Sequence, residues 1–132
     1  MKRLTPKQRE RKKLNLFKKR QKRLEKLFLK KKKEQEYQNW VRAVKERDNY
    51  TCQICGKYYG KEADQKSLPA MHIFSKENYP SLMLDINNGL TGCYWDHKNS
   101  KLSPHLDCFA FIEFFKNKFP ERYEYLLKKL KD

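Results

Sequence analysis

The sequence predicts an α+β protein: a long basic helix, followed by a small body of short extended segments and helices. Three observations lead to this fold class. No glycine or proline occurs from Lys7 to Cys55, a stretch rich in good helix formers. Short apolar segments separated by Asn, Pro and Gly come next, as expected of strands and turns. Helical apolar spacing then returns from Leu106 to the C-terminus.

Charge divides the 132 residues into two parts. Residues 1–36 carry 17 basic and 4 acidic side chains, a net charge of +13, whereas residues 37–132 carry 15 and 12, a net charge of +3. We therefore expect a basic helical arm, residues 1–36, and one folded domain, residues 37–132. With 38% apolar residues in the chain, such a domain is marginal on hydrophobic burial alone, so a bound metal would stabilise it.

The basic arm begins with a helix-capping signal. Thr5-Pro6-Lys7-Gln8 combines a capping residue, a proline at the first helical position and a glutamine three residues after the cap. The excess of positive charge points to nucleic acid as the partner, and no pattern that would read bases is visible. A plain solvated helix is the alternative. The side chains expected to contact DNA phosphates are Lys12, Lys13, Lys18, Lys19, Arg20, Lys22, Arg23, Lys30, Lys31, Lys32 and Lys33.

The sequence predicts no membrane-spanning segment and no signal peptide. The chain has no run of eighteen apolar residues, and its N-terminus lacks the apolar stretch of a signal peptide. We therefore expect a cytoplasmic protein. In a reducing compartment its four cysteines suit metal binding better than disulfides.

The folded domain should contain these elements in order. The leading helix should continue through Trp40 and Val44, and a turn should follow at residues 49–56. The further expected elements are a strand at 68–74, extended pieces at 82–84 and 89–91, a short helix from Trp95 or Asp96, a helix capped by Ser103-Pro104, and a last helix opened by Pro120.

Two cysteine-containing turns predict a structural zinc site. Cys52-Gln-Ile-Cys55-Gly56 is a turn that can present two thiolates to a metal, and Cys93-Tyr-Trp-Asp96 resembles a second one in which Asp replaces a cysteine. Zinc held by Cys52, Cys55, Cys93 and Asp96 is the leading prediction. His97 and Cys108 compete as the fourth ligand, and the alternative without metal is a set of buried thiols.

Three histidines, His72, His97 and His105, lie beside these cysteines in the sequence. Hydrolysis of a nucleic acid needs a base to deprotonate water and a cation to stabilise charge on the phosphate. A neutral imidazole suits the first task, and a hard cation such as Mg²⁺ or Mn²⁺ suits the second. Structural histidines remain the alternative.

The order of these residues is similar to that of the HNH endonucleases. The similarity covers about residues 38–128 and runs through the segments 47–56, 70–73 and 85–93 to His97. Within that superfamily the chain most resembles the bacteriophage NinG (Rap) recombination nucleases. The resemblance implies a ββα-metal finger with a zinc knuckle, flanked by helices.

The resemblance also implies roles for individual residues. His72 would be the general base, Asn88 would hold the loop of His72 in register, and His97 would bind the catalytic Mg²⁺ or Mn²⁺. Met71 stands where many HNH enzymes have a second metal ligand, and Pro69 stands where NinG-type sequences tend to have Asp.

The expected function is hydrolysis of phosphodiester bonds in branched recombination intermediates, such as Holliday junctions or D-loops, in the host cytoplasm if the chain is phage-encoded. The alternatives are an HNH homing or nicking endonuclease and a catalytically inactive zinc-containing module that binds nucleic acid. A homodimer, formed through the thin apolar stripe from Leu14 to Phe28, is a further expectation.

Overall fold

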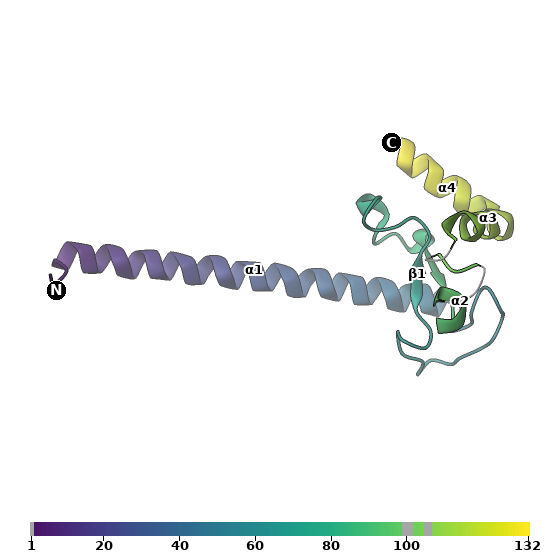
Figure 1. The fold of residues 1–132 in the computed structure, drawn as a ribbon, viewed down its shortest axis with the longest axis horizontal. Helices are drawn as coiled ribbons and strands as arrows, with labels where there is room; N and C mark the ends of the chain where they lie inside the picture. The colour runs from purple at the N-terminus through teal and green to yellow at the C-terminus, as the bar shows by residue number, and fades with distance from the viewer. Residues whose placement is uncertain (1, 99–101, 105–106) are drawn as a thin grey trace. The chain divides into compact units, whose positions relative to one another are not determined.

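The computed structural model describes residues 2–98, 102–104 and 107–132 (Figure 1). The chain divides into two compact units, Met1–Glu36 and Tyr37–Asp132, and the boundary lies where the net charge changes. Among the described residues, no helix is long and apolar enough to cross a membrane.

The first helix, α1 (Pro6–Arg47), supplies all of the regular structure of the first unit. Its N-terminus has the predicted cap: the backbone N–H of Thr5 donates to Oε1 of Gln8 at 2.8 Å, and the N–H of Gln8 donates to Oγ1 of Thr5 at 3.2 Å. These two hydrogen bonds give a partner to two backbone N–H groups that the helix itself leaves unpaired. The helix therefore begins where the sequence predicts.

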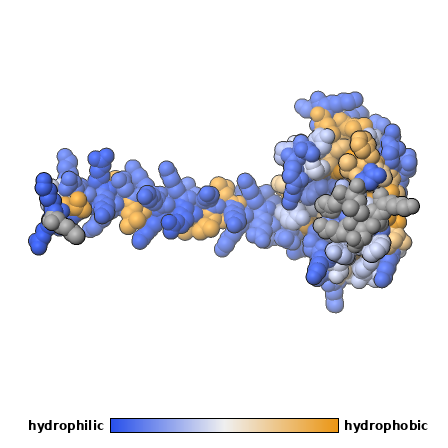
Figure 2. Space-filling model, viewed as in Figure 1, coloured by the Kyte–Doolittle hydropathy of each residue, from blue (hydrophilic) through white to orange (hydrophobic). Residues whose placement is uncertain are grey.

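The surface of unit 1 is basic on every side of the helix. None of its described residues is buried, and Figure 2 shows hydrophilic side chains interrupted by isolated apolar ones. The expected apolar stripe is therefore exposed to solvent, with relative exposures of 50% to 69%, at Leu14, Phe17, Leu24, Leu27 and Phe28.

Unit 2 contains a two-stranded antiparallel sheet, β1 (Ala70–His72) and β2 (Gly89–Thr91), followed by a short helix, α2 (Tyr94–Lys98). In this register His72 lies opposite Gly89, and Met71 lies opposite Leu90. The α+β class is confirmed, and both strands lie within segments that the sequence predicts as extended.

Two helices complete the unit: α3 (Cys108–Lys118) and α4 (Pro120–Lys131), which pack side by side (Figure 1). Pro120 begins α4, as predicted. The larger core cluster joins both helices to the sheet, and its fully buried members are Met71, Leu82, Leu90, Phe111, Phe115 and Leu126.

Two sequence expectations are wrong. Residues 82–84 do not form an extended piece, because Pro80–Leu82 forms a 3₁₀ turn, as does Ile86–Asn88 farther on. The helix expected from Ser103-Pro104 begins instead at Cys108, where the side chain of Asp107 accepts a hydrogen bond from the N–H of Ala110 at 3.0 Å. A carboxylate cap at Asp107 decides that start.

The end of α1 is joined to the sheet at Gly89. Trp40 and Val44 pack over this glycine so closely that a Cβ on it would lie 2.8 Å from the Trp40 ring and still closer to a methyl group of Val44. The carbonyl oxygen of Gly89 accepts hydrogen bonds from Nη2 of Arg47 and from Nη2 of Arg122, each at 2.6 Å. Helices α1 and α4 therefore meet the sheet at one backbone position.

Substituting Gly89 should destabilise the fold more than substituting Gly92. A Cβ at Gly89 meets the short, branched side chain of Val44, whereas one at Gly92 meets the flexible end of Met71, which has rotamers available. We expect Gly89→Ala to lower the free energy of unfolding in urea by about 2 kcal/mol. Gly92→Ala is the matched control and should cost clearly less; equal losses would contradict this account of the packing.

Candidate metal centre and histidine pocket

The first cysteine turn forms as a compact loop after α1. Gly56 has a φ of +79°, a left-handed conformation that the turn requires and glycine adopts without strain. Two backbone N–H groups, of Cys55 and Cys93, point at Sγ of Cys52 at 3.4 and 3.3 Å. Such donors stabilise a thiolate, as in metal-binding cysteine turns.

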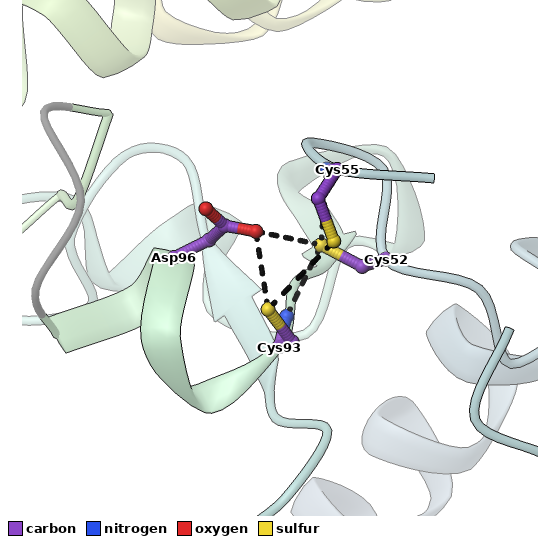
Figure 3. A group of neighbouring side chains, drawn as sticks. All are labelled: Cys52, Cys55, Cys93 and Asp96. Carbon is purple, nitrogen blue, oxygen red and sulfur yellow. Dashed lines mark hydrogen bonds between the residues drawn. The ribbon is translucent and has the colours of Figure 1, made fainter. Parts of the chain in front are cut away.

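The four predicted ligands lie together (Figure 3): their ligand atoms, from Cys52, Cys55, Cys93 and Asp96, are all within 4.8 Å of one another. Sγ of Cys55 lies 3.9 Å from Sγ of Cys93, and Oδ2 of Asp96 lies 3.2 and 3.1 Å from the sulfurs of Cys52 and Cys93. A tetrahedron with Zn–S bonds of about 2.3 Å has S–S edges of about 3.8 Å. The donor set therefore fits zinc in both chemistry and spacing.

The geometry also separates the three competing fourth ligands. Asp96 belongs to the cluster and is buried, with 6% relative exposure. Cys108 is exposed at the start of α3, and His97 is not among the clustered groups found in the described residues. Among the three candidates, the carboxylate of Asp96 is thus the one placed to be the fourth donor.

The thiols of Cys52 and Cys93 are disfavoured as bare anions. Burial raises the pKa of Cys52 to about 12 and also raises the pKa of Cys93. Tyr59 is hydrogen-bonded to Cys93 through its hydroxyl, and this bond raises the pKa of Tyr59 to about 12. A divalent cation is the charge that would allow three thiolates and a carboxylate to lie so close together.

His72 is half-buried at the end of β1, and its ring is held on two sides. The ring stacks on Trp40 with centroids 4.2 Å apart and planes 7° from parallel. Its Nε2 lies 2.9 Å from the carbonyl oxygen of Met83. Because a carbonyl only accepts, Nε2 carries the proton, and the lone pair of the neutral ring is on Nδ1.

The surroundings favour the neutral form of His72. Burial lowers its pKa below the ordinary value, the bond to Met83 works in the opposite direction, and the Lys76 charge lowers it further while the Glu77 charge raises it. The net shift is downward, so the imidazole is uncharged near neutral pH and can accept a proton through Nδ1.

Asn88 is fully buried and clamps the segment that follows β1. Its side-chain Oδ1 accepts from the N–H of Phe74 at 2.8 Å, and its Nδ2 donates to the carbonyls of Phe74 at 3.0 Å and Leu82 at 3.1 Å. Its backbone carbonyl also accepts from Ile73 at 3.0 Å. This side chain therefore fixes the loop between His72 and Leu82; its importance for catalysis stays a prediction.

His72 and His97 line the same pocket, which has a volume of about 620 Å³. His97 reaches it from α2, and the hydroxyl of Ser103 donates to the backbone carbonyl of His97. Lys76 and Glu77 also line this histidine pocket. The two histidines that the sequence selected thus face one space, while His105 lies outside the described residues.

Both departures from the HNH pattern line the histidine pocket. Met71 is 2% exposed and also belongs to the core cluster, where its thioether packs against apolar side chains. The side chain of Pro69 offers no ligand atom. Neither residue adds a metal ligand to His97.

Several residues at the pocket carry no functional signal in the sequence. Tyr37 extends the stack on Trp40, with centroids 5.8 Å apart, and Lys76 lies 5.6 Å from the centre of the Tyr37 ring. The carbonyl of Met83 orients His72. The helical spacing of Trp40 and Val44 in the sequence indicated that the end of the helix docks on the domain. It did not indicate that Trp40 stacks on His72.

The predicted DNA-contacting residues of the arm all lie on α1 with exposed side chains. They surround the helix, as a basic residue at nearly every second or third position requires.

Comparisons of the chain with protein-family models, curated proteins and solved structures give no match.

The metal centre leads to a first biochemical prediction. Purified protein should contain about one equivalent of zinc, and Cys93→Ser or Asp96→Ala should lower that content and the unfolding temperature together, because metal binding contributes to folding. Elemental analysis and thermal unfolding measure the two effects. Cys108→Ser is the matched control and should keep both; equal zinc loss in this variant would contradict the ligand assignment.

Proposed function

We propose that the protein is a metal-dependent DNA endonuclease of the HNH type, acting on branched recombination intermediates. The observation that carries the proposal is the shared pocket of His72 and His97, in which His72 is neutral and has its lone pair on Nδ1. The order of β1, β2 and α2 beside a Cys₃Asp cluster agrees with the ββα-metal finger that the resemblance implies.

The proposed chemistry is hydrolysis of a phosphodiester bond. Nδ1 of His72 takes a proton from a water molecule, the resulting hydroxide attacks phosphorus, and the bond from phosphorus to the 3′ oxygen breaks. The leaving 3′ oxygen takes up a proton from water, so the products are a 3′ hydroxyl and a 5′ phosphate. Trp40 and Met83 hold the ring, so the base is oriented before the substrate arrives.

His97 is the residue that would hold the catalytic cation, with water and phosphate oxygens at its other coordination positions, as suits Mg²⁺ or Mn²⁺. When bound, such a cation stabilises charge on the phosphate and on the leaving oxygen. Asn88 is a positioning residue in this proposal, because it acts through the loop that follows His72.

DNA is the proposed substrate because of the charge of unit 1. A surface that is basic all round a helix binds phosphate through counterion release and needs no base contacts. The choice of branched DNA comes from the resemblance to the NinG (Rap) nucleases. Branches offer several phosphate backbones at once, which suits recognition by charge and shape.

A second candidate function is a catalytically inactive zinc module that binds nucleic acid. The observation in its favour is Met71, whose buried thioether stands in place of a second ligand for the catalytic metal. Under this alternative the zinc cluster and the arm are retained for binding, and no divalent cation supports cleavage.

Cleavage of a labelled four-way junction or D-loop with Mg²⁺ or Mn²⁺ tests the proposal. Wild-type protein should cut, and His72→Asn should reduce the single-turnover rate by at least about 100-fold, because the general base is lost. Zinc content and circular dichroism check that the variant is folded. Rates that are equal in the two proteins would exclude His72 as the base; no cutting by wild type under any condition would favour the binding module.

The pH dependence of the cleavage rate tests the assignment of His72 as the general base. Activity should fall as the pH decreases through the pKa of His72, below its ordinary value near 6.5. Lys76→Gln removes a repelling cation and should move this acidic limb to higher pH, whereas Glu77→Gln should move it to lower pH. Both side chains are exposed, so the fold should tolerate these changes.

Binding by the arm predicts a steep salt dependence. Replacing Lys30, Lys31, Lys32 and Lys33 with Gln should reduce the slope of log K against log salt concentration by roughly 3 to 4 for duplex DNA, if all four neutralise phosphates. Fluorescence anisotropy over a salt series measures the slope. An unchanged slope would mean that the arm does not bind phosphate there, and the zinc content should be unaffected in either case.

A further inference from the structure

A group of exposed aromatic side chains lies beside the metal centre. Tyr94 and Trp95, in the first turn of α2, are 50% and 65% exposed. Together with Tyr59, Lys66 and Ser67 they line a second pocket of about 520 Å³, which we call the aromatic pocket. Tryptophan is usually well buried in folded proteins, so such exposure suggests a binding surface.

The metal ligands hold this surface in place. Tyr94 and Trp95 are the two residues between the donors Cys93 and Asp96, so both ends of the aromatic pair are attached to the cluster. The N–H of Tyr94 donates to the carbonyl of Ser67 at 3.0 Å, which joins the two walls of the pocket. The rings are thus presented by a backbone that is already ordered.

The aromatic pocket and the histidine pocket share α2. Successive residues of a helix are about 100° apart, so Trp95 and His97 point in directions that differ by roughly 200°. His97 lines the histidine pocket, and Tyr94 and Trp95 line the aromatic pocket. One short helix therefore separates the proposed cleavage site from the exposed rings.

The chemistry of the aromatic pocket matches an unpaired nucleotide. An aromatic ring stacks on the face of a nucleobase without regard to its identity, and the ammonium group of Lys66 can contact the adjacent phosphate. Bases inside a duplex have both faces covered by their neighbours, so only an unpaired base can stack on a protein ring. Lys57, 5.0 Å from the centre of the Tyr59 ring, adds a second cation at the same surface.

We propose that the aromatic pocket of Tyr94, Trp95 and Lys66 binds an unpaired nucleobase and its phosphate in single-stranded DNA. This inference rests on DNA as the ligand in the proposed function, but not on cleavage. The basic arm alone gives no reason for selecting branched DNA, and the aromatic pocket supplies one. An opened branch point or a displaced strand presents bases that can stack.

Intrinsic fluorescence tests the proposal directly, because the chain has two tryptophans and Trp40 is only 3% exposed. Oligothymidylate should quench the full-length protein in a saturable way, and Trp95→Phe should abolish most of the quenching while keeping the affinity within a few-fold. Trp95→Ala should weaken binding by roughly tenfold, because one stacking contact is lost. Phe109→Ala is the matched control, since Phe109 is 81% exposed on α3 and does not line the pocket.

An abasic oligonucleotide of equal length separates stacking from binding by the arm, because it keeps the phosphates. Wild-type protein should bind the abasic strand about as weakly as Trp95→Ala binds oligothymidylate. Trp95→Ala should bind the abasic strand and oligothymidylate with equal affinity. The affinity of Trp95→Ala for a blunt duplex should match that of wild type. Its zinc content should confirm that the metal centre is intact.

Equal affinities of wild type for oligothymidylate and the abasic strand would overturn the proposal, as would an equal loss of single-strand and duplex binding in Trp95→Ala. Base-dependent quenching in a protein that cuts no DNA would refute the proposed function and leave this inference standing. Cleavage without base-dependent quenching would refute this inference and leave the proposed function standing.

Discussion

The close approach of α1 to Gly89 is the contact on which the rest of unit 2 depends. Only a residue without a Cβ allows Trp40 and Val44 to pack there. The same residue offers its carbonyl oxygen to Arg47 and Arg122. Burial and the neighbouring charge of Arg47 lower the pKa of Arg122 to about 10, so it still carries its charge at neutral pH. Helices α1 and α4 are therefore tied to β2 by both packing and charge-assisted hydrogen bonds.

This junction also positions the candidate chemistry. Gly89 pairs with His72 across the sheet, and the Trp40 ring that covers Gly89 is the ring on which His72 stacks. Asn88, the residue before Gly89, fixes the loop after His72. The orientation and the lowered pKa of the proposed base thus follow from packing that the fold already requires, which places function and stability in the same few residues.

In the proposed function, DNA affinity and chemistry are divided along the chain. Unit 1 has a net charge of +13 and no buried side chain among its described residues, so the proposed contribution of this unit to DNA binding would be electrostatic and sensitive to salt. Unit 2 is nearly neutral and contains the metal cluster, the histidine pocket and the aromatic pocket. In unit 2, α2 contributes Asp96 to the cluster, His97 to one pocket and Trp95 to the other, because three faces of a short helix point in three directions.

By itself, the sequence determined the features that depend on local chemistry. The cap at Thr5, the start of α4 at Pro120 and the turn at Cys52 follow from backbone preferences of neighbouring residues. Sequence spacing also selected the three cysteines of the candidate metal cluster and favoured Asp96 as the fourth donor, but it left His97 and Cys108 as competitors. Tertiary structure alone decided that choice, the stack of Trp40 on His72 and the aromatic pocket. Each requires atoms from segments 20 or more residues apart to meet, and no local pattern contains that information.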